Sequence, residues 1–276
     1  MVTKNLQDFD IEQIANSGQC FRITQITPGT WAVKALGHTL YIIKGNEYIF
    51  DCTEEEFARI WYNYFDLETD YSIYKEIIRY SGDRYLIDAI NFGHGIRILR
   101  QDLWETIVSF IISQQNNITR IKKIIERLCL PFDGIFPSPA LLKDYSEDDF
   151  KAIGLGYRAK YIVSIVRAVL DGIFDLHYLK TLPTQEAIRY LQKFNGIGAK
   201  VANCIVLFSL HKIDAFPIDV WIKRIIDKHY SSKFPIEKYA PFAGIVQQYM
   251  FFYERCKKDV DTGDASAYHK ERGLGL

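Results

Sequence analysis

Two side chains in segment 191–224 have the types and spacing for covalent chemistry, the amine of Lys200 and the carboxylate of Asp219. Lys200 follows the turn Gly196-Ile197-Gly198 and opens an expected helix. There the helix dipole and partial burial disfavour the charged amine, which is how proteins obtain a nucleophilic lysine near neutral pH. A carboxylate from another segment can orient that amine and stabilise positive charge on the reacting group.

The glycine turn is suited to a second task, the binding of phosphate. Glycines adopt backbone angles that other residues resist, so successive amides can point outward at the start of the following helix. Such a helix start can hold a phosphate of a nucleic-acid backbone, and Gly196, Gly198 and Val201 are the candidate phosphate-binding residues. By itself, the turn fits a generic helical hairpin with a snorkelling lysine. Its combination with Cys204 and a later Pro-Ile-Asp-Val at 217–220 is much harder to obtain by chance.

The composition of the 276 residues sets limits on these interpretations. The net charge is zero, so there is no global basic signal for nucleic-acid binding. The five cysteines are scattered without a CxxC pair, which argues against a disulfide framework, a zinc site and a four-cysteine iron–sulfur cluster. We therefore expect no metal and no cofactor. A polar N-terminus and the lack of a long apolar run predict a cytoplasmic protein, on the nucleoid in a prokaryote or in the nucleus of a eukaryote, that does not bind membranes.

The hydrophobic pattern predicts an α+β fold. Alternating residues in 18–52, with expected two-residue turns at Gly37-His38 and Gly45-Asn46, indicate an antiparallel sheet. We assign 1–95 to an N-terminal sheet domain with helices and 96–276 to a mostly helical region. Within the latter, a helix-hairpin-helix motif is expected at about 185–210.

Five blocks of sequence, taken together, resemble those of the eukaryotic-type 8-oxoguanine DNA glycosylases in the helix-hairpin-helix (GPD) superfamily. The blocks are 18–22, 100–120, 154–158, 196–219 and 243–251. Membership implies a bifunctional enzyme that excises an oxidised base and then nicks the strand, with an active-site cleft between helical lobes. It implies Lys200 as the nucleophile that forms a Schiff base and Asp219 as its supporting carboxylate. The implied partner is double-stranded DNA containing oxidised guanine, and we expect a monomer.

The resemblance also implies a pocket for the everted base. The backbone carbonyl of Gly18 would accept the proton that oxidised guanine carries on N7 and guanine lacks. Gln247 would bond the Watson–Crick edge, Phe251 and Cys204 would stack on either side, and Phe110 would close the pocket. Taken singly, Phe110, Cys204 and Phe251 are better explained by ordinary core packing.

For the base opposite the lesion, the resemblance implies cytosine, read by an amide and two arginines. The matching residues are Gln115, Arg120 and Arg158, with Tyr157 as the wedge inserted into the duplex. Gln115 stands where asparagine is usual, and Trp221 stands where the family often has a histidine that contacts phosphate. Because of Gln115, selectivity for cytosine is expected to be retained but relaxed.

Three alternatives remain at this stage. One is a related glycosylase for alkylated purines, adenine or oxidised pyrimidines. The second is a non-catalytic helix-hairpin-helix protein that only binds DNA. The third is a structural protein with no role in nucleic-acid metabolism, which the neutral charge would suit.

Overall fold

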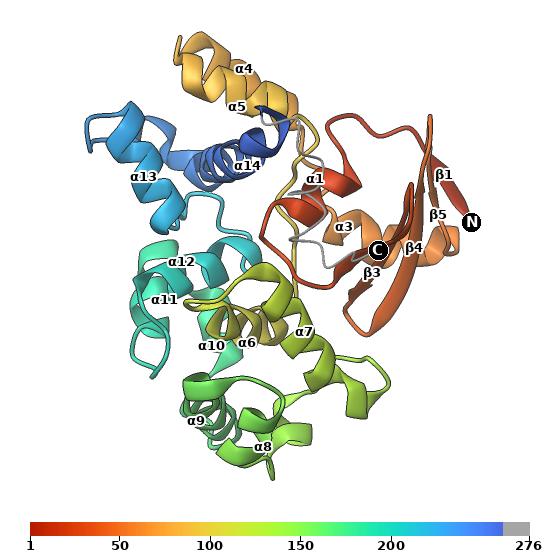
Figure 1. Cartoon of the computed structure of the whole chain (residues 1–276), viewed down its shortest axis with the longest axis vertical. Coiled ribbons are helices and arrows are strands. Elements are labelled where there is room, and N and C mark those ends of the chain that lie inside the picture. The colour runs from red at the N-terminus through yellow and green to blue at the C-terminus, as the bar shows by residue number, and fades with distance from the viewer. Residues whose placement is uncertain (262–276) are drawn as a thin grey trace.

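The computed structural model describes residues 1–261, in which a small sheet lies beside a larger assembly of helices (Figure 1). The sheet is antiparallel throughout, with strand order β1-β5-β4-β3-β2. Its strands are β1 (Val2–Lys4), β2 (Ile23–Thr27), β3 (Thr30–Ala35), β4 (His38–Lys44) and β5 (Tyr48–Phe50). The predicted α+β class is confirmed.

One face of the sheet is buried and the other faces solvent. Buried Val33, Leu40 and Ile42 share a core with α1 (Ile11–Asn16) and with a helical segment. That segment comprises α2 (Glu54–Glu56), a π-helical turn (Phe57–Trp61) and α3 (Tyr62–Tyr64). On the opposite face Tyr41 and Ile43 are exposed. This is the one-sided burial typical of antiparallel sheets.

Details of the sheet differ from the sequence prediction. Ala35 pairs with His38, so the first turn is Leu36-Gly37 and His38 is already in β4. The pairing of Lys44 with Tyr48 makes the second turn one residue longer than predicted. Strand β1 and helix α1 were not predicted, because three- and six-residue elements carry too little periodicity to stand out.

The rest of the described chain is helical and folds around one large apolar core. Its helices are α4 (Tyr71–Tyr80), α5 (Arg84–Phe92), α6 (Leu103–Ser113), α7 (Ile118–Cys129), α8 (Glu147–Ala152), α9 (Ala159–Leu170), α10 (Leu176–Thr181), α11 (Thr184–Leu191), α12 (Ala199–Phe208), α13 (Val220–His229) and α14 (Ala243–Asp261). Helices α11 and α12 form the predicted hairpin. No helix among residues 1–261 combines the length and apolar character required to cross a membrane.

Helices α4 and α5 precede the expected domain boundary at residue 95 but belong to the helical core. Ile78, Leu86 and Ile90 are buried in it, and α5 packs along α14 (Figure 1). Packing therefore joins these two helices to the helical assembly.

A buried carboxylate connects the two parts. Asp66, 1% exposed, accepts hydrogen bonds from the Tyr71 hydroxyl at 2.9 Å and from Arg100 at 2.7 Å, and it lies 3.3 Å from Nε2 of His211. Burial alone would raise the pKa of Asp66, yet the bonds and charges of His211 and Arg100 hold it below its ordinary value. The three partners come from α4, from the segment before α6 and from the loop after α12, so Asp66 fixes these segments against the sheet domain.

Candidate active site

The hairpin turn presents Lys200 at the start of α12. Gly196 has a φ of +86°, and a Cβ there would lie 2.5 Å from Cγ of Tyr161, so only glycine fits. Gly198 is the N-cap, and α12 begins at Ala199, one residue earlier than predicted. The Lys200 side chain is half-buried, and its Nζ lies 5.1 Å from the ring centroid of Phe110.

The same turn leaves the first amides of α12 uncapped by any side chain. Gly198 is exposed, and a Cβ there would meet no atom within 4 Å. The side chain of Val201 is buried, so only its backbone N–H is available to a ligand. These groups form an open helix start of the kind that holds phosphate oxygens.

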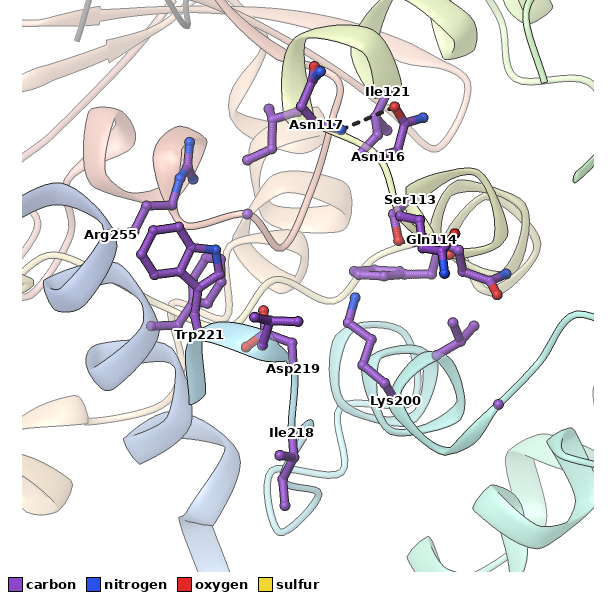
Figure 2. Close-up of a pocket in the computed structure, with 18 of the residues that line it drawn as sticks. Ser113, Gln114, Asn116, Asn117, Ile121, Lys200, Ile218, Asp219, Trp221 and Arg255 are labelled. Carbon is purple, nitrogen blue, oxygen red and sulfur yellow. Dashed lines mark hydrogen bonds between the residues drawn. The ribbon is translucent and has the colours of Figure 1, made fainter. Parts of the chain in front are cut away.

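Asp219 faces Lys200 from a different element. It is the N-cap of α13, where its Oδ1 accepts the N–H of Ile222 at 2.8 Å. This bond fixes the carboxylate and leaves its other oxygen free of that cap. Figure 2 shows the amine of Lys200 and the carboxylate of Asp219 directed into the same space. The structure thus brings together the two residues selected from the sequence as the reactive pair.

A small cavity of about 40 Å³ lies beneath this pair. Its lining contains all seven residues predicted for catalysis and base binding, together with four others that were not predicted. The seven are Gly18, Phe110, Lys200, Cys204, Asp219, Gln247 and Phe251, and the four are Ser17, Phe208, Pro217 and Gln248. The cavity has room for a few water molecules and not for a purine, so a base can enter only if its walls move apart.

The ring of Phe251 packs directly against Gly18 at one side of the cavity. Gly18 has a φ of +75°, and a Cβ on it would lie 2.9 Å from Cε1 of Phe251, so the ring rests against the glycine backbone. Phe251 is only half-buried, in contrast to Phe110, which stacks on Phe208 with ring centroids 5.5 Å apart. Phe251 is therefore the ring that can withdraw to admit a base while Phe110 stays in place.

Two further side chains that line the cavity, Cys204 and Gln247, carry no charge. Cys204 is 3% exposed; burial raises the pKa of its thiol, and the neighbouring Lys200 opposes this rise. Gln247, also 3% exposed, accepts a hydrogen bond on Oε1 from Nε2 of Gln248 at 3.0 Å. The thiol thus stays protonated and can serve as a stacking surface rather than as a nucleophile.

The three residues predicted to read the opposite base, and the predicted wedge Tyr157, lie together around the loop between α6 and α7. Gln115 is exposed with a φ of +46°, and its Oε1 lies 3.5 Å from the Tyr157 hydroxyl. Arg120 is exposed and donates to the carbonyl of Gly154 at 3.3 Å. A left-handed non-glycine residue in such a loop is a local strain typical of functional sites.

Arg158 is buried, unlike Gln115 and Arg120. It is 4% exposed, and its guanidinium donates to the carbonyls of Gln114, at 2.8 Å from Nε, and of Gln115, at 3.0 Å from Nη2. Gln114 was missed by the sequence analysis; its Nε2 donates to the carbonyl of Gly196 at 2.8 Å and so ties this loop to the hairpin. Its only sequence signal is the run of amides at 114–117, a composition common in ordinary loops.

Above the small cavity opens a cleft of about 1190 Å³. It is lined by the loop 113–119, the start of α12, residues 218–221, Phe251 and Arg255. Figure 2 shows Arg255 across the cleft from Ser113 and Lys200. Trp221, where the family often has histidine, lies at its rim with the guanidinium of Arg224 5.6 Å from its ring. Within residues 1–261, no group of three or more His, Cys, Asp or Glu side chains is placed to hold a metal ion.

The chain is similar to known DNA repair proteins along most of its length. Residues 1–107 match the N-terminal domain of 8-oxoguanine DNA glycosylase, and residues 108–240 match the HhH-GPD superfamily of base excision DNA repair proteins. The N-glycosylase/DNA lyase of Saccharomyces cerevisiae is 36% identical over 158 residues, which cover 49% of this chain and 42% of that enzyme. The chain thus spans less than half the length of that relative.

Solved structures give fuller matches. MBOgg1, bound to a low-affinity DNA ligand, is 38% identical with a TM-score of 0.86, over 92% of this chain and 95% of that one. The Clostridium acetobutylicum 8-oxoguanine glycosylase/lyase, bound to double-stranded DNA with cytosine opposite 8-oxoguanine, is 35% identical with a TM-score of 0.86, over 92% and 94% of the two chains. With both domains matched in order and these structures superimposing over nearly their whole length, the chain belongs to the 8-oxoguanine DNA glycosylase/AP lyase family of the HhH-GPD superfamily.

Proposed function

We propose that this protein removes 8-oxoguanine from duplex DNA, with a preference for lesions opposite cytosine, and then nicks the strand at the abasic site. The observation that carries the proposal is the convergence of Lys200, Asp219 and the base-binding residues on one cavity. A module that only binds DNA has no use for a half-buried amine facing a carboxylate beside a small cavity lined by aromatic rings.

The proposed chemistry begins with Lys200. Its unprotonated amine attacks C1′ of the lesion nucleotide as the bond from C1′ to the base breaks, and the base departs with the bonding electrons. Asp219 stabilises the positive charge that develops on the sugar. Opening of the sugar ring then leaves a Schiff base between C1′ and Nζ. The acidified proton on C2′ is removed, and the 3′ phosphate leaves by β-elimination.

The cavity supplies the selection of the lesion. When Phe251 withdraws from Gly18, the space between Phe251 and Cys204 can receive a flat ring. The carbonyl of Gly18 would then accept the N7 proton of 8-oxoguanine and repel the N7 lone pair of guanine. Gln247 would bond the Watson–Crick edge. A single hydrogen bond in a site closed to water can discriminate strongly, because the wrong base leaves a buried group unpaired.

The cleft supplies the contacts to the duplex. The amides at Gly196, Gly198 and Val201 would hold a backbone phosphate beside the lesion. Tyr157, 47% exposed, would fill the space of the everted base. Gln115, Arg120 and Arg158 would read the opposite cytosine. We propose that the protein acts as a monomer, since one chain supplies every group named here.

The test is a labelled duplex with 8-oxoguanine opposite each of the four bases. We expect cleavage that is fastest opposite cytosine and a borohydride-trapped adduct on Lys200, located by mass spectrometry. Cleavage of alkylated or pyrimidine lesions alone would assign the chain to a different substrate class. Binding of the duplex with neither cleavage nor adduct would overturn the enzymatic proposal.

A further inference from the structure

A second glutamine lies beside the one expected to bond the base. Gln248 and Gln247 are each 3% exposed, and both line the small cavity. Nε2 of Gln248 donates to Oε1 of Gln247 at 3.0 Å. The two side-chain amides therefore form a joined polar surface in an otherwise aromatic and aliphatic pocket.

The side-chain oxygen of Gln248 has no hydrogen-bond partner. Its Oε1 is one of the buried polar atoms of the described residues that lack a hydrogen bond. A buried carbonyl oxygen left without a donor is costly, and native proteins retain such atoms mainly where a ligand or another group supplies the donor. An unpaired acceptor on a side chain that lines the cavity thus points to a donor on the substrate.

Besides the Nε2 of Gln248 that links them, the joined amides carry a donor on Nε2 of Gln247, an acceptor on its Oε1, and the unpaired acceptor on Oε1 of Gln248. The Watson–Crick edge of 8-oxoguanine offers the complement, with an acceptor at O6, a donor at N1 and a donor on the 2-amino group. We propose that Gln248 is a specificity-determining residue whose Oε1 accepts the 2-amino group while its Nε2 holds the Gln247 amide in the orientation that suits guanine. This inference rests on the proposed function and adds to it the reading of position 2.

The bond between the amides makes their orientations depend on each other. Terminal amides rotate readily, and a rotation of both would also preserve one bond between them. That second state would place the Gln248 amino group against the 2-amino group, donor against donor. An 8-oxopurine with a 2-amino group therefore selects the first state, whereas one without it gains nothing from Gln248.

The test compares two lesions, 8-oxoguanine and 8-oxohypoxanthine, which share O6, N1–H and N7–H and differ only in the 2-amino group. For the wild-type protein we expect excision of 8-oxoguanine to be faster, measured as kcat/KM on duplexes with cytosine opposite. In Gln248→Met, which keeps the length of the side chain, that preference should shrink by about three- to tenfold, the usual effect of one hydrogen bond. A preference equal to that of the wild type would overturn the proposal.

Two controls separate an effect on base recognition from an effect on the fold. Tyr249→Phe removes the neighbouring buried hydroxyl, which also lacks a partner but does not line the cavity, and it should leave the preference unchanged. Nicking of a preformed abasic site, which places no base in the pocket, should persist in Gln248→Met. If nicking falls as much as excision does, Gln248 serves the fold and the proposal is wrong. If the wild-type protein excises neither lesion, the proposed function fails; a normal wild type with an unchanged preference in the variant refutes this inference alone.

Discussion

Substituting Gly18 by alanine tests whether the contact between Gly18 and Phe251 forms the base-binding pocket. The new Cβ has two effects that can be separated. At a φ of +75°, any residue with a Cβ pays about 1–2 kcal/mol for the left-handed backbone. In a chain of this length, this lowers the melting temperature by about 2–4 °C for each kcal/mol.

The second effect is steric and acts on the pocket. The Cβ would lie 2.9 Å from Cε1 of Phe251, whereas carbon atoms in contact prefer about 3.5–4.0 Å. The half-buried ring must therefore withdraw by about 0.5–1 Å in the empty site. When a base lies between Gly18 and the ring, the same Cβ occupies part of its space and keeps it from hydrogen-bond distance of the Gly18 carbonyl. A misplacement of about 1 Å can cost about a hundredfold in rate, so we expect excision of 8-oxoguanine to fall by about ten- to a hundredfold.

Gly37→Ala is the matched control. Gly37 has a φ of +79°, and a Cβ there would meet no atom within 4 Å, so this variant carries the backbone cost without the contact. Single-turnover excision of 8-oxoguanine and nicking of a preformed abasic site should be measured for both variants beside their melting temperatures. We expect similar melting temperatures and normal nicking, with slow excision in Gly18→Ala only. Equal excision rates in the two variants would refute the assignment of Gly18 to the pocket.

Three further predictions follow from the site and its surroundings. Lys200→Gln should bind damaged duplex but not cut it, and robust nicking by this variant would refute the role of the amine. Asp219→Asn keeps an N-cap acceptor for Ile222 but removes the charge, so turnover should fall by about tenfold or more with little change in duplex binding or melting temperature; equal losses in turnover and binding would argue against it. Burial raises the pKa of Glu105 to about 7, although its partner Arg22 opposes this rise. Because the folded state favours the protonated carboxyl, the stability it contributes is full below the ordinary pKa of 4.5 and is lost as the pH rises through about 7. The melting temperature of Glu105→Gln relative to the wild type should therefore increase between about pH 5 and about pH 8, and a constant difference would contradict this reading.

The sequence was sufficient for the hairpin because its signals are local. The turn at 196–198 needs glycine at a defined backbone angle, and the apolar face of α12 follows directly. The first turn of the sheet was displaced by one residue because Leu36 has a φ of +54°, which bulky residues rarely adopt. Short elements such as β1 depend on pairing with distant strands and have no pattern of their own.

The proximity of the site residues in the fold could not be predicted from their spacing in the sequence. Gly18 comes from the N-terminal domain and Phe251 from α14, so their contact depends on how the two parts pack. Only the resemblance to a known family placed them in one pocket. The same holds for Arg158 and Gln248, whose roles depend on which carbonyl or amide lies within reach, a property of tertiary packing that composition and periodicity do not encode.

Asp66 gives this enzyme an active site that depends on a residue outside it. The cavity is lined by Gly18 from the sheet domain and by Lys200 from the helical assembly. Asp66 links these two parts through its contacts with α4, the segment before α6 and the loop after α12. A variant that weakens these contacts of Asp66 would lower the measured activity although every reactive group was intact. Inherited or engineered substitutions near Asp66 should accordingly be judged by activity as well as by heat resistance.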